Sequence, residues 1–182
     1  VKIFKELGID SIDADDIAKN ILDSNKNARK LFIEEFGDKY ILKNHKINRD
    51  LLREDIFNDK SKIKKLESII HPIVREEIFA FIQKSESIYT IIDVPLIFET
   101  KSEDFYNKIV VVDCDTNTQI LRASQRDNKT EESILKIIGN QATREERFSI
   151  ADYVINNDSS YGNLKKEVIK THQLLLGLKV NE

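Results

Sequence analysis

Apolar residues in the first part of the chain recur with the spacings of helices and strands. Residues 1–7 carry apolar side chains on one helical stripe that stops at Gly8, a residue suited to a helix end. Residues 9–12 can form a short strand, and a second helical stripe runs through residues 17–22. This segment therefore predicts the end of a helix followed by a strand, a turn and a helix.

The next part of the chain is rich in helical patterns. They cover residues 28–36 with an end at Gly37, residues 49–57 and 61–70, and a further helix that Pro72 opens and that continues to residue 81. Consecutive helices do not fit the regular alternation of strand and helix in a simple parallel array. We therefore expect a helical insertion here.

Strand patterns return in the second half of the chain. Residues 89–94 and 109–113 are apolar on both faces, as in buried parallel strands, and are joined by a segment of helical length. Further elements are predicted as a helix over 116–126 near a Thr cap, a helix over 131–141, a strand over 153–155 and a helix over 164–176. The pattern predicts an α/β fold, with a parallel sheet and crossover helices.

The composition narrows the class of protein. The length of 182 residues suits one domain, and 40% hydrophobic with 34% charged residues is typical of a globular protein. A net charge of -3 argues against nucleic acid as the main partner. Cys114 is the single cysteine, which fits a reducing compartment, and no apolar run approaches the roughly 20 residues of a membrane helix. We expect a cytoplasmic protein without a membrane partner.

Acidic residues follow two of the predicted strands. Asp13, Asp15 and Asp93 lie at carboxyl ends of strands, where open parallel sheets bind their ligands. One carboxylate there could accept a proton from a hydroxyl during phosphoryl transfer, and a neighbour such as Asp93 could hold Mg²⁺ through water. The alternative is that Asp15 and Asp16 only cap the following helix.

Basic residues form two further groups. One comprises Arg122, Arg126, Arg144 and Arg147, whose guanidinium groups match phosphate geometry. The alternative is a solvated helix face balanced by the neighbouring Glu131, Glu132, Glu145 and Glu146.

The second group lies in the helical insertion. Arg49 and Arg53 are one helical turn apart and could bind phosphates of a substrate, or form surface ion pairs with Asp50 or Glu54. His71 precedes Pro72, where a structural hydrogen bond is the alternative to catalysis.

A series of motifs resembles those of dephospho-CoA kinases, in the same order along the chain. They are Leu7-Gly8, Ile12-Asp13-Ala14-Asp15-Asp16-Ile17-Ala18, Ile47-Asn48-Arg49 with Leu52-Arg53 and Phe57, Leu66-Glu67 with His71-Pro72, Asp93-Val94-Pro95-Leu96-Ile97-Phe98-Glu99, Gln119, Arg122, Arg126-Asp127, Gln141-Ala142-Thr143-Arg144-Glu145-Glu146-Arg147, Ala151-Asp152 and Val154-Ile155-Asn156-Asn157. The resemblance spans the whole chain.

The resemblance implies a fold and an activity. The fold is a three-layer P-loop kinase of the nucleoside-monophosphate kinase type, a single domain over residues 1–182. Its core would comprise residues 1–24, 86–118 and 150–182, with a helical insertion that binds CoA over about 25–85 and a lid over about 119–149. The activity is ATP-dependent phosphorylation of the ribose 3′-hydroxyl of dephospho-CoA, with Mg²⁺, by a monomer.

The resemblance also implies roles for individual residues. Asp15 would be the catalytic base. The substrate dephospho-CoA would contact Asp13, Arg49, Arg53, His71, Pro95 and Phe98, and ATP and the lid would involve Arg122, Arg126, Gln141, Arg144, Arg147 and Asn156.

The chain departs from the family pattern at its start. It begins at Val1, contains no Met, and lacks the glycine-rich loop that binds the phosphates of ATP in this family, so we expect this loop and its strand to precede Val1. Two other functions stay open on the sequence alone. They are phosphorylation of another small acceptor, such as a nucleoside monophosphate, and binding of CoA or a nucleotide without catalysis.

Overall fold

The computed structural model describes residues 1–56 and 59–178, which divide into two compact units. Unit 1 comprises Val1 and residues 8–94, and unit 2 comprises residues 2–7 and the chain from Pro95 onward. Phe57, which the sequence places at the end of a helix, lies outside the described residues.

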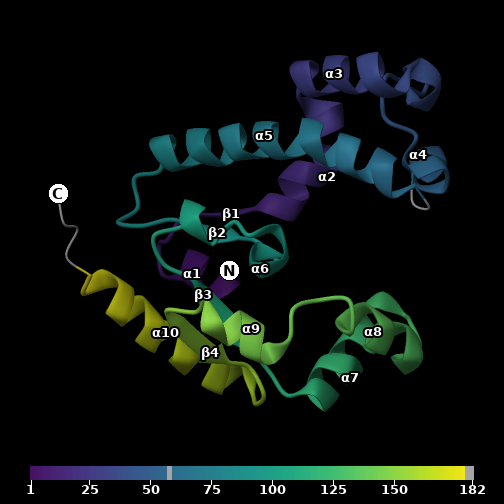
Figure 1. Ribbon diagram of the computed structural model, residues 1–182. Coiled ribbons are helices and arrows are strands. Elements are labelled where there is room, and N and C mark those ends of the chain that lie inside the picture. Colours follow the sequence, from purple (N-terminus) through teal and green to yellow (C-terminus); the bar gives the residue numbers. More distant parts are fainter. Residues whose placement is uncertain (57–58, 179–182) are drawn as a thin grey trace. The chain divides into compact units, whose positions relative to one another are not determined.

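Unit 1 consists of a small parallel sheet and a group of helices. Its elements are β1 (Ser11–Asp13), α2 (Ala14–Ser24), α3 (Lys26–Phe36), the 3₁₀ turn η1 (Asp38–Tyr40), α4 (Arg49–Ile56), α5 (Lys60–Lys84) and β2 (Ile91–Asp93) (Figure 1). Strands β1 and β2 pair in parallel, with Ser11 opposite Ile91 and Asp13 opposite Asp93. The predicted strands at 9–12 and 89–94 are therefore present, but β2 is shorter and β1 is shifted toward its carboxyl end.

Local capping fixes the ends of the first helices. The Asp13 side chain caps α2, and Asn25 ends α2 and caps α3, where its side-chain oxygen accepts from the backbone N–H of Ala28. Gly37 ends α3 with a φ of 84°, and Gly8 follows the first helix with a φ of 80°. Both glycines were expected as helix ends, because such positive φ angles strain other residues.

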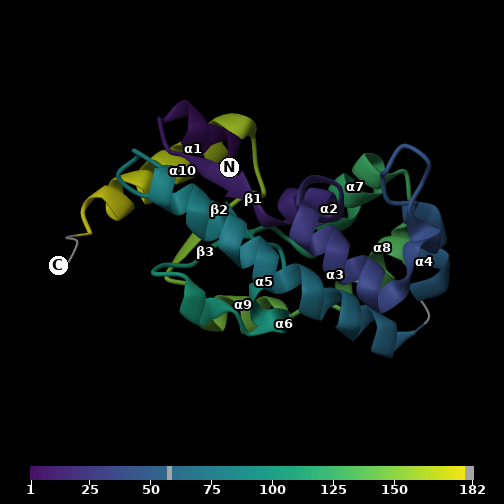
Figure 2. The same ribbon diagram turned by 90° about the horizontal axis from the view of Figure 1, so that it is seen from above.

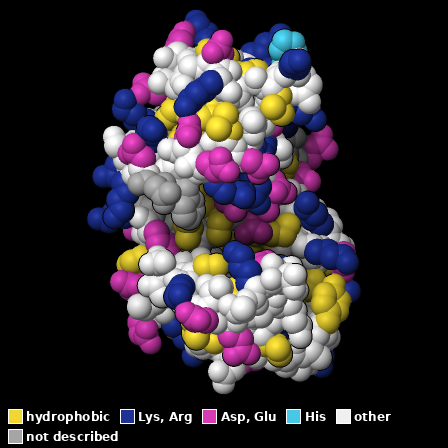
Figure 3. Space-filling model, turned by 90° about the vertical axis from the view of Figure 1, so that its right-hand side faces the viewer, with side chains coloured by type: hydrophobic (Ala, Val, Ile, Leu, Met, Phe, Trp, Pro, Cys, Tyr) yellow, Lys and Arg dark blue, Asp and Glu magenta, His cyan; other side chains and the backbone are white. Residues whose placement is uncertain are grey.

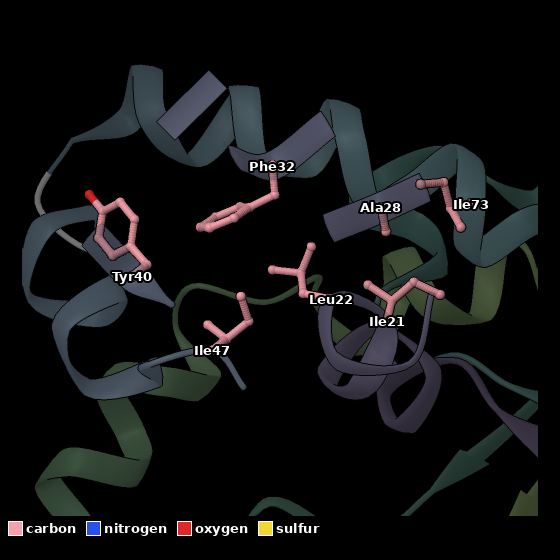
Figure 4. Close-up of a cluster of buried hydrophobic side chains, with 7 residues drawn as sticks. All are labelled: Ile21, Leu22, Ala28, Phe32, Tyr40, Ile47 and Ile73. Atoms are coloured by element: carbon pink, nitrogen blue, oxygen red, sulfur yellow. The ribbon is translucent and has the colours of Figure 1, made fainter. Parts of the chain in front are cut away.

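The core of unit 1 lies among α2, α3, η1 and α5 (Figure 4). Phe32 is fully buried, its ring stacks on Phe36 with 5.1 Å between centroids, and it meets the edge of Tyr40 at 5.7 Å. Burial of each such large side chain stabilises a fold by about 1.5–3 kcal/mol. The buried cluster consists of Ile21, Leu22, Ala28, Phe32, Tyr40, Ile47 and Ile73.

Helix α5 corrects one prediction. The sequence predicts two helices separated at Pro72, whereas a single helix runs through Pro72 from Lys60 to Lys84. Proline lacks an N–H and clashes with the preceding turn, which disfavours a helix interior. The helix continues because its apolar side chains Ile73, Val74 and Ile78 are buried in unit 1, so packing outweighs the local cost.

Unit 2 contains a second small parallel sheet with its own helices. Its elements are α1 (Lys2–Glu6), α6 (Ile97–Thr100), the 3₁₀ turn η2 (Glu103–Phe105), β3 (Val110–Asp113), α7 (Thr116–Asp127), α8 (Glu131–Ile138), α9 (Arg144–Ser149), β4 (Tyr153–Asn156) and α10 (Tyr161–Leu176). Strands β3 and β4 are parallel, with Val110 opposite Tyr153 and Asp113 opposite Asn156. Figure 2 shows α1 beside α10, where Lys165 and Glu6 form an ion pair at 3.4 Å.

Several boundaries in unit 2 differ from the sequence prediction. The segment between the strands forms the short α6 and η2 rather than one helix, since Lys101 adopts a left-handed conformation that ends α6. Helix α7 is capped by Asp115 rather than by a Thr, and α8 ends at Ile138 before Gly139. Helix α9 was not predicted from the sequence.

The fold is α/β, with parallel strands as predicted. The described residues form one two-stranded sheet in each unit. Lys and Arg side chains are interspersed with Asp and Glu side chains over the face shown in Figure 3. Among the helices of residues 1–56 and 59–178, none is long and apolar enough to cross a membrane.

Candidate active site

Three carboxylates interact at the carboxyl ends of the strands in unit 1. Asp13 and Asp93 are register partners at the ends of β1 and β2, and Asp15 lies in the first turn of α2. The parallel pairing thus brings together the acidic residues that the sequence singles out. This is the edge of a parallel sheet at which ligands bind.

Asp13 and Asp15 have different surroundings. An oxygen of Asp13, Oδ1, accepts from the backbone N–H of Asp15 at 2.8 Å and of Asp16 at 3.1 Å. The cap of α2 is therefore Asp13, and the alternative that Asp15 and Asp16 serve as caps is wrong. The Asp15 side chain is 55% exposed, and its ion pair with Lys19 is long, at 3.9 Å. Asp15 thus has a carboxylate available to accept a proton.

The surroundings of Asp93 disfavour its charged form. Asp93 is exposed at the end of β2, but partial desolvation by its neighbours, together with the negative charges of Asp13 and Asp15, raises the pKa of its carboxyl above the ordinary value. A cation near these carboxylates would relieve the repulsion, and carboxylate oxygen is a ligand that Mg²⁺ prefers. Within the described part of the chain, no three Asp, Glu, His or Cys side chains are grouped so that they alone could hold a metal ion.

The arginines of the helical insertion in unit 1 differ in their partners. Arg49 Nη2 donates to Asp23 Oδ2 at 2.7 Å, so its partner is Asp23 rather than Asp50 or Glu54. Arg53 is exposed and pairs with no other described residue.

Asp23 also accepts a second hydrogen bond. Its Oδ1 accepts from the backbone N–H of buried Ile47 at 2.9 Å. Burial acts to raise the pKa of Asp23, but the hydrogen bonds from Ile47 and Arg49 outweigh burial and lower it. Asp23 therefore orients Arg49 from α2.

His71 is exposed on α5. Its backbone carbonyl accepts from Arg75 Nε at 3.4 Å.

In unit 2, Arg144 forms an ion pair with a buried carboxylate. Its Nη2 donates at 2.5 Å to Oδ2 of Asp113, a residue only 4% exposed at the end of β3. The hydrogen bond with Asp113 raises the pKa of Arg144 further above its ordinary value. The guanidinium also lies 5.2 Å from the Phe148 ring, while the Arg144 side chain remains 52% exposed. The guanidinium of Arg144 is thus held through one of its nitrogens, with further donors left for a ligand.

The other arginines of the predicted lid bind neighbouring backbone or carboxylate groups. Arg122 Nη1 donates to the carbonyl of Asn157 at 2.5 Å. Arg126 donates twice to Asp127, at 2.7 and 3.0 Å. The four glutamates proposed as balancing charges are not their partners.

Of four further predicted residues of unit 2, three are exposed. Asn156 lines a cavity of about 240 Å³ with Ser159, Asn163, Lys166 and Glu167. Gln141 is exposed beside α9. Pro95 is exposed after β2, and Phe98 is half-buried on α6.

Sequence reasoning missed Asp23 and Asp113 as partners of site arginines. Asp113 ends a strand that the sequence predicts, the same signal that identified Asp93, so it could have been selected. Asp23 carries no such signal, because its role depends on a residue far along the chain.

The comparisons with known proteins agree on one family. The family model described as "Dephospho-CoA kinase" matches residues 1–163. A dephospho-CoA kinase from Gamma-proteobacterium EBAC31A08 is 50% identical over 169 residues, which cover 93% of this chain and 86% of that protein. A dephospho-CoA kinase from Hydrogenovibrio crunogenus is 35% identical over 178 residues, covering 94% of this chain and 90% of that one.

Two solved structures are similar to this chain. Dephospho-CoA kinase from Campylobacter jejuni is 32% identical with a TM-score of 0.71, covering 96% of this chain and 88% of that chain. The crystal structure of TT1252 from Thermus thermophilus has a TM-score of 0.80 at 21% identity, covering 97% of this chain and 90% of that one, and supports the fold alone. With a family model over most of its length and a relative at 50% identity, this chain belongs to the dephospho-CoA kinase family.

Proposed function

We infer that this protein transfers the terminal phosphoryl group of ATP to the ribose 3′-hydroxyl of dephospho-CoA, which is the last step of coenzyme A biosynthesis. The observation that carries this inference is the 50% identity, over 93% of the chain, to a dephospho-CoA kinase. The carboxylates at the ends of β1 and β2 supply chemistry that suits the reaction.

We propose Asp15 as the catalytic base. The acceptor hydroxyl must lose its proton as it attacks the phosphoryl group, and an ionised carboxylate within hydrogen-bond reach can accept that proton. Asp15 suits this role because its carboxylate is exposed and only weakly paired with Lys19. Asp13 supports it by holding the backbone of Asp15 through the helix cap, and would line the same pocket.

Asp93 is the residue that would hold Mg²⁺, through a bound water. Mg²⁺ with ATP would neutralise charge on the phosphates. The raised pKa of Asp93 among like charges supports a nearby cation, and the carboxylates Asp13 and Asp15 provide the matching negative field.

Further residues are proposed for each substrate. Dephospho-CoA would be bound by Arg49, Arg53 and His71, with Pro95 and Phe98 contacting its less polar parts. ATP would be bound by Arg122, Arg126, Gln141, Arg144 and Arg147 of the lid, with Asn156 near the adenine. The half-exposed guanidinium of Arg144 supports this assignment, since it retains free donors.

The domain arrangement is part of the same proposal. A core of residues 1–24, 86–118 and 150–182 would form a three-layer fold, in which helices flank one parallel sheet. The CoA-binding insertion would cover about residues 25–85 and the lid about residues 119–149. We propose that the enzyme acts as a monomer in the cytoplasm.

The test is Asp15→Asn in the enzyme expressed from its complete coding sequence. Loss of a general base lowers turnover by about 10²- to 10⁴-fold, while binding of dephospho-CoA measured by calorimetry should change little. The matched control is Asp16→Asn, because Asp16 lies beside Asp15 in the same helical turn, is 70% exposed and pairs with the same Lys19 at 3.8 Å. Turnover of Asp15→Asn within a few-fold of wild type would reject the role of Asp15.

A substrate panel separates the remaining alternatives. Phosphorylation of dephospho-CoA with little activity on nucleoside monophosphates is expected. A preference for a nucleoside monophosphate would contradict the proposed acceptor, and binding of both substrates without any turnover would favour a non-catalytic role.

A further inference from the structure

The backbone of Ala142, just before α9, is held by a charged side chain from another part of unit 2. Glu99 Oε1, on the short helix α6, accepts from the backbone N–H of Ala142 at 2.7 Å. Glu99 and Ala142 are 43 residues apart in the chain. Ala142 is 8% exposed, so its N–H cannot readily exchange this partner for water.

The other side of the same residue is also held. Arg147 Nη1 donates to the backbone carbonyl of Ala142 at 2.6 Å. Glu99, Ala142 and Arg147 form what we call the Ala142 clamp. Hydrogen bonds in which one partner is ionised are stronger than neutral ones, so the clamp fixes both the N–H and the carbonyl of Ala142.

The clamp lies immediately before the start of α9. Thr143 and Glu146 form a capping box, in which Thr143 N donates to Glu146 Oε2 at 2.7 Å and the Thr143 hydroxyl accepts from Glu146 N at 3.2 Å. The first residue of the helix is Arg144, which is paired with Asp113. The direction in which Arg144 leaves the backbone is therefore set by the clamp, the cap and Asp113 together.

We propose that Glu99 is a positioning residue for Arg144. The carboxylate of Glu99 anchors Ala142, the anchored backbone fixes the start of α9, and Arg144 is thereby presented to the phosphates of ATP. This inference rests on the proposed function of Arg144. It also gives a role to Glu99, the last residue of the family motif that begins at Asp93.

The first test compares Glu99→Ala with Glu99→Gln. Ala removes the acceptor, whereas Gln keeps a side-chain oxygen at the same place. Loss of a hydrogen bond to a charged group corresponds to roughly a tenfold effect or more, so kcat/KM for ATP should fall at least about tenfold in Glu99→Ala. Glu99→Gln should lie between Glu99→Ala and wild type, since it keeps an acceptor for the Ala142 N–H but loses the charge that strengthens this hydrogen bond.

Hydrogen exchange provides a readout independent of activity. The Ala142 amide should exchange faster in Glu99→Ala than in wild type or Glu99→Gln. The control is Glu131→Ala, which removes an exposed carboxylate from α8 in the same unit and should change neither the exchange rate nor kcat/KM. If the Ala142 amide exchanges at the wild-type rate in Glu99→Ala, the proposal is overturned, whatever the activity of this variant.

A double-mutant cycle with Arg144→Ala shows whether Glu99 acts through Arg144. If it does, adding Glu99→Ala to Arg144→Ala lowers kcat/KM little further, because the positioned group is already gone. Full additivity of the two effects would refute a positioning role. If Arg144→Ala alone leaves kcat/KM unchanged, the proposed function of Arg144 fails instead, and the two failures are thus distinguished.

Discussion

Replacement of Asp23 by Ala should destabilise unit 1 and at the same time weaken the substrate contact proposed for Arg49. The Asp23 side chain is 23% exposed and joins two groups from the segment that precedes and begins α4. It accepts from the backbone N–H of Ile47 at 2.9 Å and from Arg49 at 2.7 Å.

The expected magnitude follows from these two contacts. Ile47 is 5% exposed, and a buried N–H left without its partner costs about 1–3 kcal/mol. The ion pair with the half-exposed Arg49 contributes roughly 0.2–1 kcal/mol. Asp23→Ala should therefore lower the free energy of unfolding by about 2–3 kcal/mol, whereas Asp23→Asn keeps an acceptor for Ile47 and should lose about 1 kcal/mol or less.

Urea unfolding at pH 7 measures this difference, with Glu54→Ala on α4 as the control for loss of an exposed carboxylate. Because the pKa of Asp23 is lowered in the folded protein, its contribution is present above the ordinary value of 3.8 and is lost as the pH falls through the folded pKa. The KM for dephospho-CoA should also rise several-fold in both Asp23 variants, since Arg49 loses its orienting partner. An Asp23→Ala variant whose free energy of unfolding lies within about 0.5 kcal/mol of wild type, half the value of a typical hydrogen bond, would refute this reasoning.

Further predictions concern single side chains. Asp93→Asn should raise the urea midpoint at pH 7 while lowering turnover. Because the pKa of Asp93 is raised in the folded protein, the penalty on wild type begins as the pH rises above the ordinary value of 3.8 and is complete above the folded pKa, so the gain in stability should vanish as the pH falls below 3.8. A lower midpoint at pH 7 would contradict this. Pro72→Ala restores the helical hydrogen bond to Ser68 and should raise the free energy of unfolding by about 1–2 kcal/mol, measured in urea, with an unchanged or lower value as the contrary result. Asp152→Asn should be less stable than wild type at pH 7, and this difference in the free energy of unfolding should shrink as the pH falls below 3.8, because the hydrogen bond from Lys108 lowers the pKa of Asp152 in the folded protein. A difference that does not change with pH would argue against this cause.

The sequence predicted much of the local structure, because helix ends and strand patterns depend on neighbouring residues. The helix that stops at Gly8, the helices on either side of Asn25 and the acidic ends of the strands could be anticipated from spacing and residue type. The order of the family motifs also identified the family. The sequence was less informative where packing outweighs local preference, as at Pro72 within α5.

Other features were decided by the tertiary structure. The partners of the site residues are distant along the chain: 26 residues separate Asp23 from Arg49, 31 separate Asp113 from Arg144, and 43 separate Glu99 from Ala142. A charged side chain has many possible partners within a sequence of this composition, and only folding selects one by placing two groups within hydrogen-bond distance. Residue types and their order therefore determined which chemistry this protein carries, while the packing of its helices and strands decided which carboxylates are left free and which hold the arginines in place.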